Sequence, residues 1–193
     1  MNTQEVAKVN NKYQLGFWVY LMTDCLLFGS LFATYAVLRG ATYGGPTEAD
    51  IFEMPFVLAE TLILLTSTFV CGLGLVAAKA GKQTWTIILF GLTMLLGIAF
   101  LAMELSEFSK LIGEGFSWQR SAFLSAFFVL VGTHGAHILA GLIWVVVMLV
   151  RVTQRGLTPN NLRRLSLFAL FWHFLDVIWI FIFTVVYLMG VAK

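Results

Sequence analysis

Residues 122–150 read AFLSAFFVLVGTHGAHILAGLIWVVVMLV and contain no Asp, Glu, Lys or Arg. A helix rises about 1.5 Å per residue, so about 20 such residues cross the roughly 30 Å hydrocarbon core of a bilayer. An apolar run of this length without charged residues is typical of a transmembrane helix. This segment therefore predicts that the chain lies in a membrane.

The composition of the whole chain agrees with this prediction. Of its 193 residues, 60% are hydrophobic and 11% are charged, and the mean hydropathy is +0.89. A soluble domain of this size is far less apolar. The net charge is only +2 and the basic residues are dispersed among the loops, so no basic face indicates a nucleic-acid partner.

Outward from this segment, four more windows are long and apolar enough to be spans. The five predicted spans cover residues 16–38, 55–78, 85–112, 122–150 and 165–189. The segments between them are rich in Gly, Pro, Asn and charged residues, which is typical of turns and loops. Because no soluble domain or internal repeat is evident, residues 1–193 are predicted to form a single all-α bundle of five transmembrane helices.

The positions of Lys and Arg predict the orientation, because positively charged flanks are held in the cytoplasm. The side that carries the N-terminus has eight of the twelve: Lys8, Lys12, Lys79, Lys82, Arg151, Arg155, Arg163 and Arg164. The other side has Arg39, Lys110, Arg120 and Lys193, together with the acidic residues Glu48, Asp50, Glu53 and Glu114. We therefore expect the N-terminus in the cytoplasm and the C-terminus outside.

Ionisable side chains inside the spans are the most informative residues for function. They are Asp24, Glu60, Glu104, Glu107, His134, His137, His173 and Asp176. Each costs about 2.5–3.5 kcal/mol on insertion scales unless it finds a partner. Three pairs, 104/107, 134/137 and 173/176, are separated by three residues, so both members share one helix face. We expect them to form a buried polar network between the helices.

The same residues could instead bind a metal, bind a haem or relay protons. Glu, His and Asp at this spacing on facing helices can bind metals. Glu104 and Glu107 lie in the outer third of their span, however, whereas the four residues His134, His137, His173 and Asp176 lie nearer the midplane, so one compact metal site is hard to assemble. A bis-histidine haem would need His134 or His137 opposite His173. A proton relay remains an alternative because buried carboxyl and imidazole groups are the components of relays. The structural network is favoured, and we expect no metal or cofactor in this chain.

Two further sets of residues are predicted to shape the bundle. Helix backbones are expected to pack closely at the small residues Gly29, Ala33, Gly91, Gly97, Gly132, Ala136 and Ala140. Trp18, Trp85, Trp118 and Tyr187 lie near span ends and are expected to anchor the chain at the membrane interface. Because no nucleophile with its base and no phosphate loop is evident, the residues alone indicate a membrane scaffold or accessory subunit.

Several motifs resemble a known family. The stretches THGAH at 133–137 and FWHFLDVIW at 171–179 resemble the two signatures of subunit III of the haem-copper terminal oxidases. The stretches LSEF at 105–108, FEMP at 52–55 and FGSLFA at 28–33 follow in the order and spacing of that family. Within it, LMTDC at 21–25 and GGPT at 44–47 are most similar to the quinol-oxidising branch, the bacterial cytochrome bo-type ubiquinol oxidases. Cytochrome c oxidases commonly carry Glu where this chain has Asp24.

The resemblance implies an accessory role in the bacterial inner membrane. Subunit III of such an oxidase, which reduces O₂ to water and translocates protons, stabilises subunit I and is expected to support proton uptake. Its partners are subunit I, subunits II and IV and membrane lipid. The haems and copper belong to subunit I, and phospholipids bind in grooves of the bundle. Longer family members have seven spans, so this chain lacks the cleft that their first two helices form.

The same resemblance implies two interhelical clusters, one of Glu107 with His134 and His137 and one of His173 with Asp176. Two other functions remain open. A subunit III of a bacterial cytochrome c oxidase shares the motifs, because the electron donor binds to other subunits. A small ion transporter would use the buried carboxyl and histidine side chains to bind its ion.

Overall fold

The computed structural model describes residues 3–42, 44 and 54–191, and nearly all of them are helical. The helices are α1 (Thr3–Leu38), α3 (Met54–Lys79), α4 (Gln83–Gly113), α5 (Ala122–Arg155), α6 (Pro159–Ile182), the π-helix η1 (Phe183–Leu188) and α7 (Met189–Val191). Five of these segments are long and apolar enough to cross a membrane, with η1 continuing α6. The prediction of an all-α chain with five long apolar helices is confirmed.

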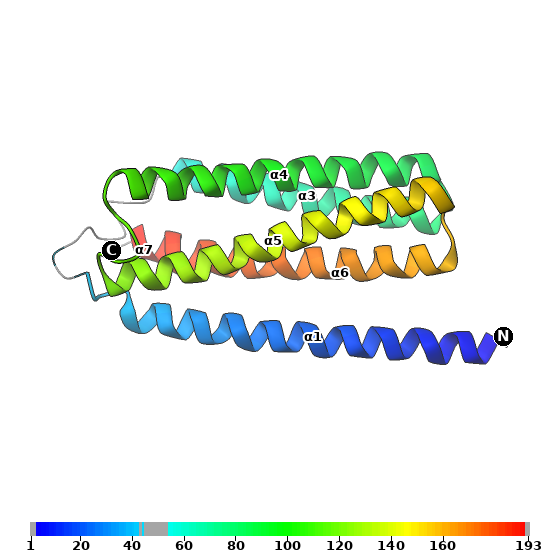
Figure 1. Ribbon diagram of the computed structural model, residues 1–193, viewed down its shortest axis with the longest axis horizontal. Coiled ribbons are helices and arrows are strands. Elements are labelled where there is room, and N and C mark those ends of the chain that lie inside the picture. Colours follow the sequence, from blue (N-terminus) through cyan, green and yellow to red (C-terminus); the bar gives the residue numbers. More distant parts are fainter. Residues whose placement is uncertain (1–2, 43, 45–53, 192–193) are drawn as a thin grey trace.

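Four helices form the body of the molecule and the first helix packs on its side. Helices α3, α4, α5 and α6 form a closed ring in which each contacts the next, and α6 returns to α3. Helix α1 contacts only α5 and α6 closely, as Figure 1 shows by its place along one edge of the bundle. It is also the least buried of the five candidate spans. Most of the surface of α1 therefore faces away from the rest of the chain.

The helices extend beyond the predicted spans. Residues 151–164 read as a basic loop, yet α5 continues to Arg155 and α6 starts at Pro159. Gly156 ends α5 with a φ of +68°, a left-handed conformation that glycine adopts without strain. The Thr158 hydroxyl then accepts a hydrogen bond from the Asn161 N–H and caps α6. The predicted span ended at residue 150 because charged residues lower the hydropathy there. The helix itself continues until the capping residues end it.

Part of the sequence prediction lies outside the described residues. This holds for positions 45–47 of the GGPT stretch, for positions 52 and 53 of the FEMP stretch, and for the loop acids Glu48, Asp50 and Glu53. The terminal Lys193 is also outside them. The helix that follows, α3, begins at Met54 with Pro55 in its first turn, where proline lacks only an N–H that has no helical partner.

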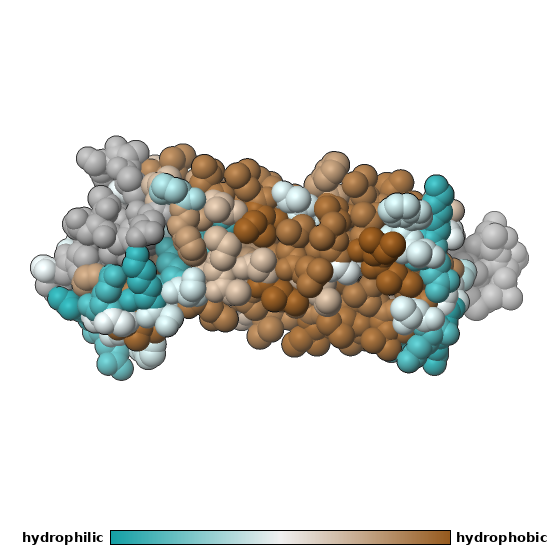
Figure 2. Space-filling view, turned by 90° about the horizontal axis from the view of Figure 1, so that it is seen from above, coloured by the Kyte–Doolittle hydropathy of each residue, from teal (hydrophilic) through white to brown (hydrophobic). Residues whose placement is uncertain are grey.

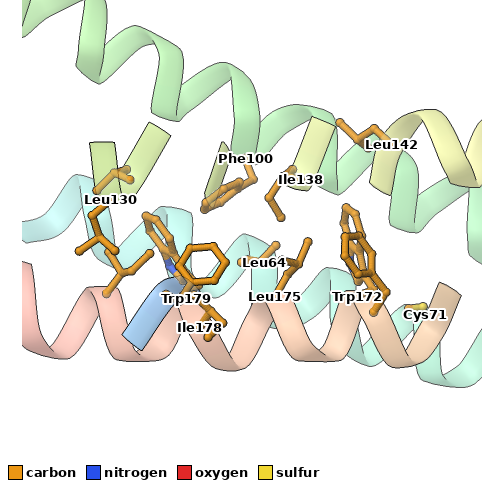
Figure 3. Close-up of a cluster of buried hydrophobic side chains, with 14 of the residues drawn as sticks. Leu64, Cys71, Phe100, Leu130, Ile138, Leu142, Trp172, Leu175, Ile178 and Trp179 are labelled. Carbon is orange, nitrogen blue, oxygen red and sulfur yellow. The ribbon is translucent and has the colours of Figure 1, made fainter. Parts of the chain in front are cut away.

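Large aromatic side chains fill the centre of the ring. Trp172 and Trp179 of α6 point inward with Leu175 between them, and Phe100 of α4 meets Trp179 (Figure 3). The face seen in Figure 2 is a broad apolar band with hydrophilic residues at both ends, and large apolar side chains are exposed on all five spans. A ring of helices that is apolar on both its inner and outer faces suits a bilayer rather than water.

Candidate functional site in the buried polar groups

Three carboxyl groups meet in the half of the ring that carries Gly113 and Ala122. Glu60 of α3 is 0% exposed and Glu104 of α4 is 2% exposed. They lie near Glu107, one turn further along α4, so that the charges of the three groups influence one another. We call Glu60, Glu104, Glu107 and the nearby Tyr187 the carboxyl cluster.

Tyr187 supplies the hydrogen bond of this cluster. Its hydroxyl donates to Oε2 of Glu107 over 3.1 Å. Tyr187 lies in η1, whose hydrogen bonds are wider than those of an α-helix, and its side chain is fully buried. The sequence had placed Tyr187 among the interfacial anchors, and this is wrong. The π-helix alters the register at the end of the span and turns this phenol into the bundle.

Glu60 and Glu104 differ from Glu107 because their carboxyl oxygens have no hydrogen-bond partner within the described part of the chain. Glu104 lies directly on α5, since a Cβ placed on Gly135 would come within 2.8 Å of Glu104 Oε1. Any larger residue at position 135 would require the carboxyl group to shift. The sequence prediction did not name Gly135, although it lies between the two histidines of the THGAH motif.

His134 is an aromatic side chain of the core rather than a polar partner. It is fully buried, and its ring stacks on Trp179 with centroids 5.3 Å apart. Phe100 meets the same imidazole edge-on at 6.0 Å. Neither ring nitrogen has a hydrogen-bond partner among the residues that the structure describes. The resemblance had implied a cluster of His134 with Glu107. The structure shows no hydrogen bond between these two side chains.

His137 links α5 to the first helix. Its Nδ1 lies 2.7 Å from the carbonyl oxygen of Thr133, so this nitrogen carries the proton and donates it. Its Nε2 lies 3.7 Å from Oδ2 of Asp24, which is buried in α1. Tyr20 of the same helix lies beside the Asp24 carboxyl group. The contact becomes an ion pair when the imidazole is protonated, and it joins α1 to the ring.

His173 and Asp176 are close together on α6 but differ in burial. His173 Nδ1 lies 2.6 Å from the Ala169 carbonyl oxygen, and the ring is on the exposed side of the helix. Its Nε2 lies close to Gly72 of α3. Asp176 is buried beside Thr68, within electrostatic range of His173. Through Gly72 and Thr68, these two residues place polar groups of α6 against α3.

Two tryptophans that the sequence prediction did not single out make the clearest polar contacts across the ring. Trp172 Nε1 donates to Ser67 Oγ over 3.1 Å, and Ser67 donates in turn to the carbonyl oxygen of Thr93. Trp179 Nε1 donates to Thr61 Oγ1 over 3.1 Å. We call Trp172 and Trp179 with these partners the tryptophan cluster. Their N–H groups are satisfied, as buried indoles require.

Glycines make room for the tryptophan cluster. A Cβ on Gly97 of α4 would lie 2.9 Å from the Trp172 ring, and one on Gly141 of α5 would lie 2.8 Å from it. Gly97 was among the small residues named from the sequence, but the others named there do not pack against Trp172. Gly29 has nothing within 4 Å of a Cβ position and Gly132 makes an ordinary contact. Ala33, Ala136 and Ala140 are exposed.

The polar groups thus fall into separate contacts instead of one network. The structure brings Glu60, Glu104 and Glu107 together, pairs Asp24 with His137, and pairs His173 with Asp176. Among residues 3–42, 44 and 54–191, no group of three or more His, Cys, Asp or Glu side chains is placed to hold a metal ion. The contacts tie α1 to α5, η1 to α4, and α6 to α3.

Comparison with known sequences places these contacts in a family. The sequence model described as cytochrome c oxidase subunit III matches residues 1–191. The chain belongs to the cytochrome c oxidase subunit III family. The resemblance read from the THGAH and FWHFLDVIW stretches is therefore confirmed. In this family member, those two stretches supply one side of several contacts between the helices, through His134, His137, Trp172, His173, Asp176 and Trp179.

Individual family members are similar over nearly the whole chain. One is the cytochrome bo(3) ubiquinol oxidase subunit 3 of Pseudomonas aeruginosa, 57% identical over 91% of this chain and 84% of that protein. The same subunit of Pseudomonas putida is 55% identical over 92% of this chain and 86% of that protein. The cytochrome c oxidase subunit 3 of Bacillus sp. strain PS3 is 45% identical over 94% and 87%.

Proposed function

We propose that this chain is the accessory subunit III of a bacterial quinol-oxidising haem-copper terminal oxidase. The observation that carries the proposal is its similarity to the subunits 3 of cytochrome bo(3) ubiquinol oxidases, at 57% and 55% identity over nine-tenths of the chain. In such an oxidase, subunit I holds the haems and copper and reduces O₂ to water as protons cross the membrane. This chain stabilises subunit I and supports its proton uptake.

The contacts between the helices support an accessory role. Trp172 and Trp179 bond to hydroxyl groups on α3, and Tyr187 bonds to Glu107 on α4. These bonds hold the ring together, and much of its outer surface remains apolar. We propose that this surface contacts subunit I first, subunits II and IV in addition, and phospholipids elsewhere.

The charge distribution supports an orientation with the N-terminus in the cytoplasm of a bacterial inner membrane. Lys79, Lys82, Arg151 and Arg155 lie at the helix ends that share the side of the N-terminus. Positively charged flanks are held in the cytoplasm. A phosphatase reporter, active only outside the cytoplasm, should be active when fused after residue 193 and inactive when fused in the α3–α4 turn. The reverse result would contradict the orientation.

Deletion of the gene for this chain tests the accessory role. The remaining oxidase should keep its haem content per subunit I but lose activity sooner during continuous turnover. Haem content is measured by the reduced-minus-oxidised spectrum, and lifetime by oxygen consumption. Re-expression of the chain is the control and should restore the lifetime. Loss of haem from the purified remainder would contradict a role without redox centres.

The second candidate function is subunit III of a cytochrome c oxidase, because a relative of that name is 45% identical over 94% of this chain. The oxidase that co-purifies with this chain in mild detergent distinguishes the two. We expect it to consume oxygen with ubiquinol and not with reduced cytochrome c. Activity with cytochrome c alone would assign the chain to the other branch.

A further inference from the structure

A groove opens on the outer surface between α4 and α5. Its volume is about 170 Å³. It is lined by positions 101, 104, 105 and 108 of α4 and by positions 132, 135, 136 and 139 of α5. Each set has spacings of three and four residues, so the groove runs along both helices. In Figure 1, α5 runs obliquely to α4, and the two helices separate toward the ends that carry Gly113 and Ala122.

One wall of the groove carries a buried carboxyl group without a donor. Glu104 lines the groove and is 2% exposed, and neither of its oxygens has a hydrogen-bond partner in the described part of the chain. A polar group left in this state is costly in lipid. Gly135 beneath it prevents retreat, because the carboxyl group already lies against that glycine. The groove is a side from which a donor can reach Glu104.

The wall that α5 forms carries mostly small residues. Gly132, Gly135 and Ala136 line it beside Leu139, and Ala140, exposed like Ala136, continues the four-residue spacing of Gly132 and Ala136 just beyond the groove. No close contact within the chain uses this stripe, since a Cβ on Gly132 would only touch Phe108 at 3.7 Å. Small residues at this spacing let a second helix backbone approach closely in a membrane.

We propose that this groove binds one transmembrane helix of another subunit of the oxidase, with a hydrogen-bond donor side chain of that helix placed on the Glu104 carboxyl group. The proposal rests on the proposed function and adds the surface and the chemistry of contact. The small stripe accepts the helix backbone, and Glu104 selects a Ser, Thr, Tyr or Trp donor. The partner's residue satisfies the carboxyl group as Tyr187 satisfies Glu107.

The depth of Glu104 favours a helix over a lipid. Glu104 lies six residues from the middle of α4, about 9 Å along the axis, when the middle of α4 is taken as the middle of the bilayer. Lipid head groups, which carry the donors of a phospholipid, begin about 15 Å from the midplane. An acyl chain at the depth of Glu104 has no donor. A side chain of a transmembrane helix reaches this depth without distortion of the bilayer.

Photo-crosslinking in the intact oxidase tests the proposal. A benzophenone amino acid replaces Leu105, a large exposed side chain that lines the groove, or, as the matched control, Leu95, which is exposed on α4 but does not line the groove. Native membranes are illuminated and the products identified by mass spectrometry. We expect position 105 to give a crosslink to another oxidase subunit at about ten times the yield of position 95. Equal yields, a crosslink to lipid alone, or a crosslink to a second copy of this chain would overturn the proposal.

A substitution that fills the groove gives a second measurement. Ala136→Leu should reduce the fraction of this chain retained by the oxidase in mild detergent about tenfold, which corresponds to about 1.4 kcal/mol of binding free energy. Ala102→Leu should leave that fraction unchanged, since Ala102 is exposed on α4 but does not line the groove. Equal retention of the two variants would overturn the proposal. Circular dichroism of both variants checks that the helices are intact.

The two measurements separate this proposal from the proposed function. If the unmodified chain brings no haem protein with it during purification, both the function and the groove proposal fail. If it brings the oxidase, but position 105 crosslinks to no other subunit, only the groove proposal fails.

Discussion

The tryptophan cluster and the carboxyl cluster use the same arrangement with different results. In both, a bulky side chain lies on a glycine of α5: Trp172 on Gly141 and Glu104 on Gly135. Trp172 is closed in, with its N–H bonded to Ser67 and a second glycine, Gly97, on its other side. Glu104 borders a groove and its oxygens lack donors in the described chain. The first contact is complete within this chain, and the second is suited to a partner.

The largest effect is expected where the tryptophan cluster is tightest. Gly141→Ala places a Cβ 2.8 Å from the Trp172 ring, which has no free direction in which to move. We expect the free energy of unfolding to fall by about 2–3 kcal/mol, as for overpacked cores. The measurement is unfolding by sodium dodecyl sulfate in mixed micelles, followed by circular dichroism.

Gly91→Ala is the matched control for Gly141→Ala, because nothing lies within 4 Å of a Cβ at Gly91. This variant should be as stable as the unmodified chain or more stable, since alanine is the better helix former. An equal loss of stability in both variants would contradict the tight contact on Trp172.

The next effect comes from the indole hydrogen bond. Trp172→Phe removes the donor to Ser67 and part of the ring, so the free energy of unfolding should fall by about 1–2 kcal/mol. Trp85→Phe is the control, because Trp85 is exposed near the start of α4 and should tolerate the change. The same detergent titration measures both. A larger loss from Trp85→Phe would show that the interface, rather than the tryptophan cluster, limits stability.

A smaller effect is expected in the carboxyl cluster. Tyr187→Phe removes only the hydroxyl that donates to Glu107, so the loss should be about 0.6–1 kcal/mol, within the range for hydrogen bonds between transmembrane helices. The double variant Tyr187→Phe with Glu107→Gln separates this bond from other contacts of the two residues. Fully additive effects of the two substitutions would contradict coupling between them.

The smallest effect should come from Gly135→Ala. Its Cβ would lie 2.8 Å from Glu104, the same distance that separates the Cβ of Gly141→Ala from Trp172. The carboxyl group is the end of a flexible side chain and has the groove beside it. We expect a loss of about 0.5 kcal/mol or less, below the overpacking range. A loss as large as that of Gly141→Ala would show that both contacts are closed, and the contrast between the clusters would be lost.

The sequence predicted the number and approximate position of the helices because charges and turn residues interrupt long apolar runs. It did not predict which face of each helix is buried. In a chain where the outer surface is as apolar as the core, periodicity carries little information, and Trp172 and Trp179 were therefore not singled out. Gly135 and Gly141 were missed for a related reason, since a glycine at a close contact resembles one that faces open space; Gly97 and Gly91 were both named as packing residues, yet only Gly97 of the two lies at a close contact.

The polar residues were the better guide to the site. Insertion cost alone selected Glu60, Glu104 and Asp176, and the structure buries all three. Their partners could not be predicted, because partners depend on helix rotation. His134 meets aromatic rings, while His137, three residues later, meets Asp24 on another helix. Sequence spacing places two residues on one face but does not say which neighbour that face meets.

The π-helix η1 has a consequence for the length of the last span. Its hydrogen bonds run from residue i to i+5, so it holds one residue more than an α-helical turn would. Removal of a single residue between Phe183 and Val186 would let the turn revert to α-helix and leave every later side chain at nearly the same angle relative to α6, because the π turn holds one residue more than the α turn that replaces it. The phenol of Tyr187 would then still face Glu107. We therefore expect homologous chains with a one-residue gap in this segment to keep a donor on that carboxyl group from the same helix.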